Sequence, residues 1–88
     1  MSSKKPAQPK RMAKKLREIR SRLGFTQEQM ANALRENAAK EVKIYDGYVG
    51  IYETGTRTPL PLVILAYAKT AGISTDVLID DELELPFK

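Results

Sequence analysis

The sequence contains neither cysteine nor histidine, and both absences exclude functions. Without cysteine the chain forms no disulfide and carries out no thiol chemistry. Histidine is the commonest metal ligand and the commonest general acid or base, so most metal sites and most enzymes are excluded with it. The sequence also lacks a Gly-rich phosphate loop and a clustered pair of carboxylates in a plausible pocket. We therefore expect a protein that is not an enzyme and that uses no cofactor and no metal.

Long apolar runs are absent as well. No stretch approaches the length of about 20 residues that a membrane-spanning helix requires, and nothing resembles a signal peptide. We expect a cytoplasmic protein with no membrane partner. The 88 residues suffice for one small domain, which is marginally stable unless its helices pack well.

Acidic residues are scarce at the start of the chain, and basic residues are scarce at its end. Residues 1–25 contain nine Lys/Arg and one Glu, a net charge of +8. Residues 76–88 contain five Asp/Glu and one Lys, a net charge of −4, and the residues between them balance. A basic beginning indicates a polyanionic partner. The alternative is a solvated tail without a partner.

Two helices are predicted in the first half of the chain. Residues 10–23 carry one apolar stripe, with Lys15 among the basic residues of the other faces, and Gly24 is placed to end the helix. Thr26 and Gln29 have the spacing of a capping box, so the second helix begins there and continues to about residue 39.

Two more helices are predicted near the end. Residues 61–71 form a mostly buried helix with Pro61 in its first position, and Ser74 caps a short last helix. The chain therefore divides into a disordered basic tail (1–9), a helical domain (10–80) and an acidic tail (81–88). The acidic tail is expected to be either a flexible end or a short extended arm.

The segment KIYDGYVGIYETGTRTP, which begins at residue 43, is typical of two different structures. Asp46-Gly47 between apolar residues is a strong signal for a β-hairpin. The same letters also predict a short helix of about residues 46–54, with Asp46 as N-cap and Gly55 just past its end. Considered alone, the segment slightly favours the hairpin.

Four sequence features, which occur in the order typical of one family, shift the preference from the hairpin to the helix. Gly24, the pair Thr26-Gln27, the segment YETGTRTP and the segment AGISTDVLI together resemble the lambda-repressor/Cro-like (XRE) helix-turn-helix family over about residues 11–79. The resemblance implies an all-α, five-helix, lambda-repressor-like DNA-binding domain, in which the segment ending in YETG is the recognition helix. This sequence departs from the family in segment 36–45, where extra residues predict an extended connection between the second and third helices.

The resemblance also implies contacts with DNA phosphates. Gln27 matches the family's phosphate-contacting glutamine, and Arg57 matches a basic position after the recognition helix. The N–H groups at the start of the second helix favour an anion as well, although Thr26 serves equally well as a structural cap alone. The predicted phosphate contacts are Thr26, Gln27, Lys40, Lys43 and Arg57. Arg20 and Glu53 match family positions that pair between the first and third helices.

The predicted base-reading positions are Tyr45, Asp46, Gly47, Tyr48 and Gly50. A tyrosine can offer its ring to a thymine methyl group and its hydroxyl to a base or a phosphate. Asp46 can accept from a cytosine amino group, although the N-cap role is favoured. The two glycines let the backbone approach DNA closely, or they are tolerated at about 1 kcal/mol relative to Ala. Because polar readers are few, DNA shape is expected to contribute to specificity.

The sequence thus predicts a sequence-specific DNA-binding transcriptional regulator that acts as a homodimer on a two-fold operator. A basic arm that follows the DNA is expected from Lys4, Lys5, Lys10 and Arg11. The dimer surface is expected to involve Ile79, Leu83, Leu85 and Phe87. The alternative is a protein-interaction module, for instance an antitoxin-like partner binder, that keeps the fold without specific DNA reading. Its tail DELELPF would add a strand to a protein partner.

Overall fold

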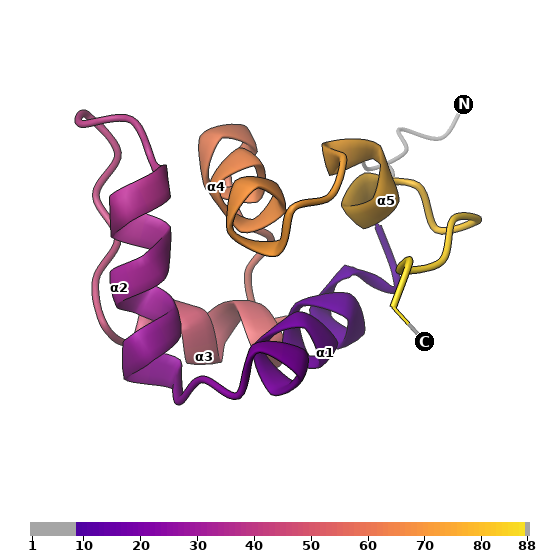
Figure 1. Cartoon of the computed structure of the whole chain (residues 1–88), viewed down its shortest axis with the longest axis horizontal. Coiled ribbons are helices and arrows are strands. Elements are labelled where there is room, and N and C mark those ends of the chain that lie inside the picture. Colours follow the sequence, from indigo (N-terminus) through magenta and orange to yellow (C-terminus); the bar gives the residue numbers. More distant parts are fainter. Residues whose placement is uncertain (1–8, 88) are drawn as a thin grey trace, which may run out of the picture.

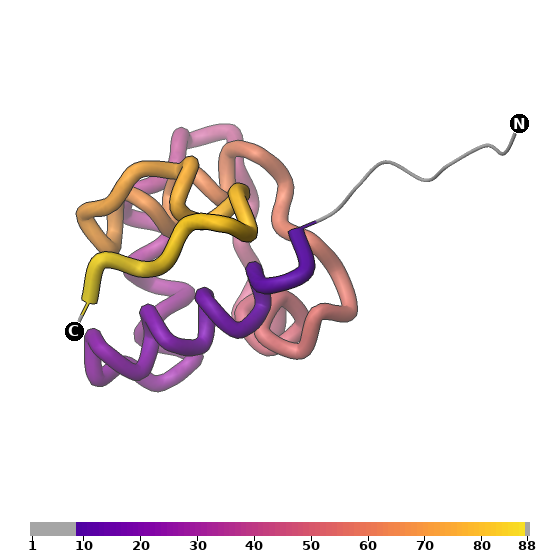
Figure 2. Tube along the Cα trace, turned by 90° about the vertical axis from the view of Figure 1, so that its right-hand side faces the viewer, coloured from indigo at the N-terminus to yellow at the C-terminus, as the bar shows by residue number. Residues whose placement is uncertain are grey.

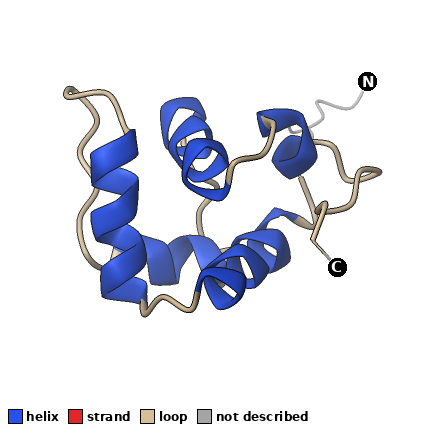
Figure 3. Cartoon of the chain, viewed as in Figure 1, coloured by secondary structure: helices blue, strands red, loops and turns tan. Residues whose placement is uncertain are grey.

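The computed structural model describes residues 9–87, and over that range the chain forms helices and no strand (Figure 1 and Figure 3). The helices are, in order, α1 (Met12–Leu23), α2 (Gln27–Asn37), α3 (Tyr48–Glu53), α4 (Pro61–Ala71) and α5 (Thr75–Ile79). This confirms the predicted all-α fold of five helices with an extended connection between the second and the third. The β-hairpin does not form.

Several helix ends follow from local sequence signals. Gly24 and Gly72 end α1 and α4 in the left-handed conformation, with φ of 73° and 71°. Gly55 follows α3 with φ of 77°. A side chain at these positions would be strained. Thr26 and Gln29 form the predicted capping box at the start of α2.

The Asp46-Gly47 pair forms a turn, but the turn leads into a helix instead of a second strand. The N–H of Tyr48 donates to the carbonyl of Tyr45 at 3.0 Å. α3 begins at Tyr48 with Gly47 in the N-cap position, and no side chain caps it. The prediction that Asp46 is the N-cap of a helix over 46–54 is therefore wrong. The carboxylate of Asp46 accepts instead from the guanidinium of Arg35 in α2.

The connection between α2 and α3 spans residues 38–47 and runs back along α2 at one edge of the molecule (Figure 1). α2 ends at Asn37, earlier than expected, because the next residue is extended. Arg35 holds the connection in place: its Nε donates to the carbonyl of Ile44 at 2.8 Å, and its guanidinium pairs with Asp46. Ile44 is itself part of the hydrophobic core. The extra residues are thus packed against the domain.

The core lies between the helices, with α2 packed on α4 and α3, and α1 packed on α3, α4 and α5. Each large apolar side chain that is fully buried contributes roughly 1.5–3 kcal/mol to stability. The largest of these side chains are Tyr67, Leu16, Ile19, Met30, Leu34, Leu78 and Val49.

Lys15 departs from the predicted pattern, because it is 3% exposed instead of lying on the basic surface of α1. Its Nζ donates to the carbonyl oxygens of Val77 at 2.7 Å and Asp80 at 3.0 Å. These carbonyls belong to the C-terminal end of α5, where helical carbonyl groups have no partner within the helix. A cation is favoured at that end of a helix, so Lys15 joins α1 to α5.

The acidic C-terminal segment, residues 81–87, lies beside α1 (Figure 2). The Asp81 carboxylate accepts from the backbone N–H groups of Lys10 at 2.9 Å and Arg11 at 3.0 Å. The guanidinium of Arg11 pairs with Glu84 at 2.7 Å. Arg11, which was expected on a DNA-binding arm, is thus paired within the chain, and its contact with DNA stays a prediction. Lys4 and Lys5, the other end of that arm, lie outside the described residues.

Apolar contacts also hold the C-terminal segment. Leu85 and Phe87 pack against the hydrophobic core, and the guanidinium carbon of Arg22 lies 5.6 Å from the centre of the Phe87 ring. Of the four residues predicted for a dimer surface, these two are thus engaged inside the chain. Ile79 and Leu83 stay exposed, at 49% and 39%.

Acid should release this segment. The backbone N–H groups of Lys10 and Arg11 hold the pKa of Asp81 below its ordinary value, and the hydrogen bond from Arg11 lowers the pKa of Glu84. A carboxyl group with a lowered pKa stabilises the folded contact above its ordinary pKa, and that stabilisation is lost as the pH falls through the lowered value. We expect the segment to detach below about pH 4. Amide chemical shifts of Lys10 and Arg11 that do not change down to about pH 2 would contradict this.

Candidate nucleic-acid interface

A buried ion pair fixes α3 against α1. Glu53, at the end of α3, is 4% exposed, and its carboxylate accepts from Nε and Nη2 of Arg20 at 2.6 and 3.0 Å. Arg20 also donates to the carbonyl of Phe25 at 3.0 Å. The hydrogen bond with Glu53 raises the pKa of Arg20 further, so the guanidinium remains charged. The pair expected between Arg20 and Glu53 is present, and it sets the orientation of α3.

Gln27 lies where α2 crosses α3. Its Nε2 donates to the Glu53 carboxylate at 3.3 Å, and its side chain covers Gly50. A Cβ atom on Gly50 would stand 3.3 Å from Oε1 of Gln27, so a larger residue there would have to shift the end of that side chain. The expectation that Gly50 reads bases is not supported, because this position is turned toward α2. Gly47, by contrast, is exposed, and a Cβ atom there would meet nothing within 4 Å.

The first turn of α2 is ordered by its cap. The N–H of Gln29 donates to Oγ1 of Thr26 at 3.1 Å, and the N–H of Thr26 donates to Oε1 of Gln29 at 2.8 Å. Thr26 therefore acts as the N-cap of α2, which is the structural role expected of it. Its contact with a phosphate stays a prediction, as does that of Gln27.

A row of tyrosines runs from the surface at α3 into the core. The Tyr45 and Tyr48 rings meet edge to face at 5.2 Å between centres, Tyr48 and Tyr52 at 5.9 Å, and Tyr52 and Tyr67 at 6.4 Å. Tyr45 is 58% exposed, whereas Tyr67 is fully buried, which raises the pKa of its hydroxyl. Ring contacts of this kind restrict the side chains. Two tyrosine rings are thus held in position on or near the surface at the start of α3.

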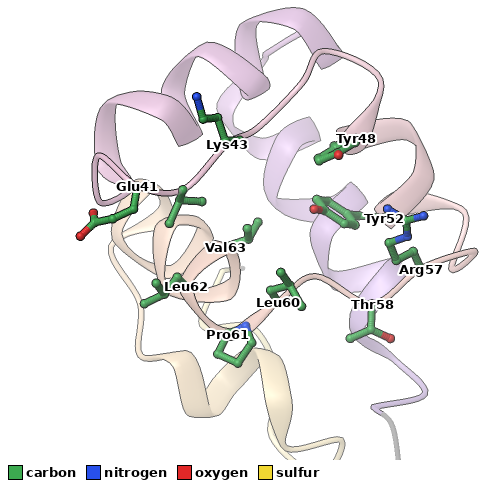
Figure 4. A pocket seen from close by; sticks show the side chains of 11 residues that line it. Glu41, Lys43, Tyr48, Tyr52, Arg57, Thr58, Leu60, Pro61, Leu62 and Val63 are labelled. Atoms are coloured by element: carbon green, nitrogen blue, oxygen red, sulfur yellow. The ribbon is translucent and has the colours of Figure 1, made fainter.

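Two exposed cations, Lys43 and Arg57, line a pocket together with Tyr48 and Tyr52. Lys40, Lys43 and Arg57 are exposed, and none of them pairs with a carboxylate within residues 9–87. Arg57 is close enough to Tyr52 to oppose the rise in the pKa of that hydroxyl caused by burial. Figure 4 shows Lys43 and Arg57 on opposite sides of Tyr52. The surface around α3 therefore presents aromatic rings between positive charges.

Two arginines whose partners no sequence pattern indicated also shape this surface. The guanidinium of Arg17 donates to the backbone carbonyl of Glu53, at the end of α3. Arg35 anchors the connection before α3. A basic residue in the last turn of a helix, as Arg35 is, indicates a contact with free carbonyl groups. The position of Arg35 in the helix does not predict that its carbonyl partner, that of Ile44, belongs to another segment.

Among the described residues, no group of three or more His, Cys, Asp or Glu side chains is placed to hold a metal ion. No helix of the described chain has both the length and the apolar character needed to cross a membrane.

Comparison with known proteins supports the fold at low sequence identity. No family model matches the sequence, and no curated protein matches it significantly. A solved structure, the P22 c2 repressor in complex with synthetic operator 9T in the presence of Tl+, is similar with a TM-score of 0.61 and 23% identity. The match covers 80% of this chain and 94% of the repressor chain. At this identity the likeness shows the fold alone, which is the helical fold of the P22 c2 repressor.

Proposed function

We propose that this protein is a sequence-specific DNA-binding transcriptional regulator that reads the major groove with α3. The observation that carries the proposal is the surface around α3. This surface contains the rings of Tyr45 and Tyr48 and the exposed cations Lys43 and Arg57. No carboxylate of the described residues pairs with either cation. Cations that flank a reading surface match the phosphates that flank a groove. The solved neighbour with this fold is a repressor in complex with an operator, which supports the proposal.

In this binding mode α3 enters the major groove and the N-terminus of α2 faces the phosphate backbone. The residues proposed on phosphates are Thr26, Gln27, Lys40, Lys43 and Arg57. Tyr45 and Tyr48 are proposed as base readers, with Gly47 allowing close approach of the backbone. Asp46 contributes little, because its carboxylate is paired with Arg35 and phosphates would repel it. With so few polar readers, the shape of the groove supplies part of the specificity.

We propose a homodimer on a two-fold operator, because one small domain offers a limited interface with DNA. Ile79 and Leu83 are the exposed members of the predicted dimer surface. The alternative function, a module whose tail adds a strand to a protein partner, is less favoured. Leu85 and Phe87 of that tail pack on the core of their own chain, and a partner would first have to displace them.

Selection of bound sequences from a random pool of duplexes at about 0.15 M salt tests the proposed function. Enrichment of one common sequence is the expected result. A pool that stays random, with binding lost for every duplex at this salt concentration, would contradict sequence-specific reading and would favour the interaction module.

Arg57→Gln should weaken binding to every sequence by a similar factor, roughly tenfold at physiological salt, and should reduce the salt slope by about one. The reason is that a phosphate contact adds affinity without reading bases. The measurement is a set of DNA-binding titrations at several salt concentrations. Lys69→Gln, at the end of α4, removes the same charge at a distance from α3 and serves as control. An unchanged salt slope would exclude Arg57 as a phosphate contact.

Tyr48→Ala should change which sequence is preferred, in contrast to Arg57→Gln. Tyr48→Phe keeps the ring and its contacts with Tyr45 and Tyr52 while removing the hydroxyl. Repeating the selection with both variants separates ring contacts with thymine methyl groups from hydrogen bonds of the hydroxyl. If both variants select the sequence that the unchanged protein selects, Tyr48 is not a base reader.

A further inference from the structure

A pocket of about 650 Å³ opens beside α3 (Figure 4). Its walls come from three segments: the connection before α3, α3 with the loop that follows it, and the first turn of α4. Each wall contributes apolar or aromatic side chains, for example Val42 from the connection, Tyr52 from α3 and Leu62 from α4. Sites for small molecules are concave, mostly apolar and about 300–1,000 Å³ in volume. The extra residues of the connection therefore build one wall of a space that suits a small molecule.

The wall from α4 exposes large apolar side chains. Leu60 and Leu62 line the pocket and are 71% and 51% exposed, whereas Val63 beside them is buried. Covering such side chains with an apolar body is favourable, because it removes their surface from water. A ligand that enters this pocket gains from carrying an apolar ring or chain.

The polar groups of the pocket favour an anion. Lys43 and Arg57 line it, and neither pairs with a carboxylate within the described residues. Tyr52 also lines the pocket, and burial raises the pKa of its hydroxyl, so the hydroxyl remains a neutral donor. Glu41 is the carboxylate of the lining, and Figure 4 shows it at the far edge from Tyr52 and Arg57.

We propose that this pocket binds a small organic acid with an apolar body. The apolar body covers Leu60 and Leu62, and the acidic group lies near the Tyr52 hydroxyl, which can donate a hydrogen bond, with Lys43 and Arg57 on either side of Tyr52. A few charged or hydrogen-bonding groups in an apolar pocket fix the orientation of a ligand and determine its specificity. Here those groups are two cations and one hydroxyl donor, which select an anion over a neutral or cationic analogue.

The same acid should regulate DNA binding, a consequence that rests on the proposed function. Arg57 and Tyr48 line the pocket and also belong to the surface proposed for DNA. An acid in the pocket pairs with cations that would otherwise contact phosphates. Ligand and DNA therefore compete, and the acid acts as an effector that releases the protein from DNA.

Binding of the acid is tested first, without DNA, by following backbone and methyl chemical shifts of the full chain during titration with 2-naphthoate. Its uncharged isostere, 2-naphthamide, is the matched control. We expect saturable shifts at the pocket walls, with a Kd of about 1 mM for a ligand of this size. The amide should bind at least about fivefold more weakly, because it cannot pair with the cations. No saturation up to about 10 mM, or equal binding of acid and amide, would overturn the proposal.

Variants locate the site. Leu60→Ser should weaken the binding of both ligands, and because Leu60 is 71% exposed, this change leaves the fold intact. Lys43→Gln combined with Arg57→Gln should reduce the difference between acid and amide to less than about twofold. Leu23→Ser and Lys69→Gln remove an exposed leucine and an exposed lysine that do not line the pocket, so binding should be unchanged. If Leu23→Ser weakens binding as much as Leu60→Ser, the ligand lies elsewhere and the proposal fails.

Competition with DNA is the second test. Addition of 2-naphthoate to the complex with a selected duplex should release the DNA, whereas sodium chloride at the same ionic strength should release less. If DNA binds and 2-naphthoate does not release it, the regulatory role is wrong although the site exists. If no duplex is bound specifically, the proposed function fails, and the titration without DNA still decides the binding site.

Discussion

Replacing Glu53 with alanine should lower the free energy of unfolding by about 3 kcal/mol. Breaking a buried ion pair by removal of one partner costs about 3–5 kcal/mol, because the remaining charge is left buried. Here the side chain of Arg20 is 26% exposed, so water relieves part of that cost and the lower end of the range applies. Small domains are stable by only about 5–15 kcal/mol, so the effect should be evident in urea unfolding followed by circular dichroism.

Two further variants separate the cost of the unpaired charge from the value of the pair. Glu82→Ala removes an exposed carboxylate and should change stability by less than about 0.5 kcal/mol. Arg20→Met combined with Glu53→Leu removes both charges and keeps their bulk, so it should recover most of the loss. A double variant as unstable as Glu53→Ala would show that the loss comes from packing and not from the unpaired guanidinium.

Affinity for DNA should decrease in Glu53→Ala even where the protein is still folded. The carboxylate also accepts from Gln27 at 3.3 Å, so it joins the start of α2 to the end of α3. These are the two elements that the proposed function places on the backbone and in the groove. Without Glu53 their relative position is held by fewer contacts, and a misplaced reading helix loses contacts along its length.

Local signals predicted those parts of the fold that depend on adjacent residues. The capping box at Thr26 and the left-handed glycines need only the chemistry of a few neighbouring positions, and they appear as expected. The Asp46-Gly47 pair shows what local signals do not determine. It specifies a turn, and the turn forms, but whether a strand or a helix follows depends on packing. Val49 and Tyr52, spaced for a helix, are both buried on the core face of α3, and that burial decides in favour of the helix.

Parts of the candidate site depend on residues far apart in the chain, and these were not predictable from local patterns. Arg35 reaches the carbonyl of Ile44 across the end of α2, and Gln27 covers Gly50 where two helices cross. Neither contact has a periodicity or a motif. The pair Arg20–Glu53, separated by 33 positions, was expected solely because the segment resembles a known family. The pocket had no signal in the sequence beyond the extra length of the connection that forms one wall.

Lys15 is the clearest example of a residue whose position local patterns do not predict. Its replacement by alanine should lower the free energy of unfolding by about 3 kcal/mol. On the helical pattern of α1 a lysine is assigned to the water-facing side, because lysine is almost never fully buried unless it is paired. Its partners are the carbonyls of Val77 and Asp80, which lie more than 60 positions away in sequence. Hydrogen bonds to a charged group are worth about 1.5–3 kcal/mol each, and the buried alkyl stem adds to the loss.

Lys15→Met distinguishes the two contributions, because methionine keeps an apolar stem and removes the ammonium. We expect it to lose about half as much stability as Lys15→Ala, since the carbonyls at the end of α5 then have only water to bond with. Lys14→Ala, at the neighbouring exposed position, should change stability by less than about 0.5 kcal/mol. Should Lys15→Met be as stable as the unchanged protein, the ammonium would contribute nothing to the joint between α1 and α5, and the burial of Lys15 would be explained by its stem alone.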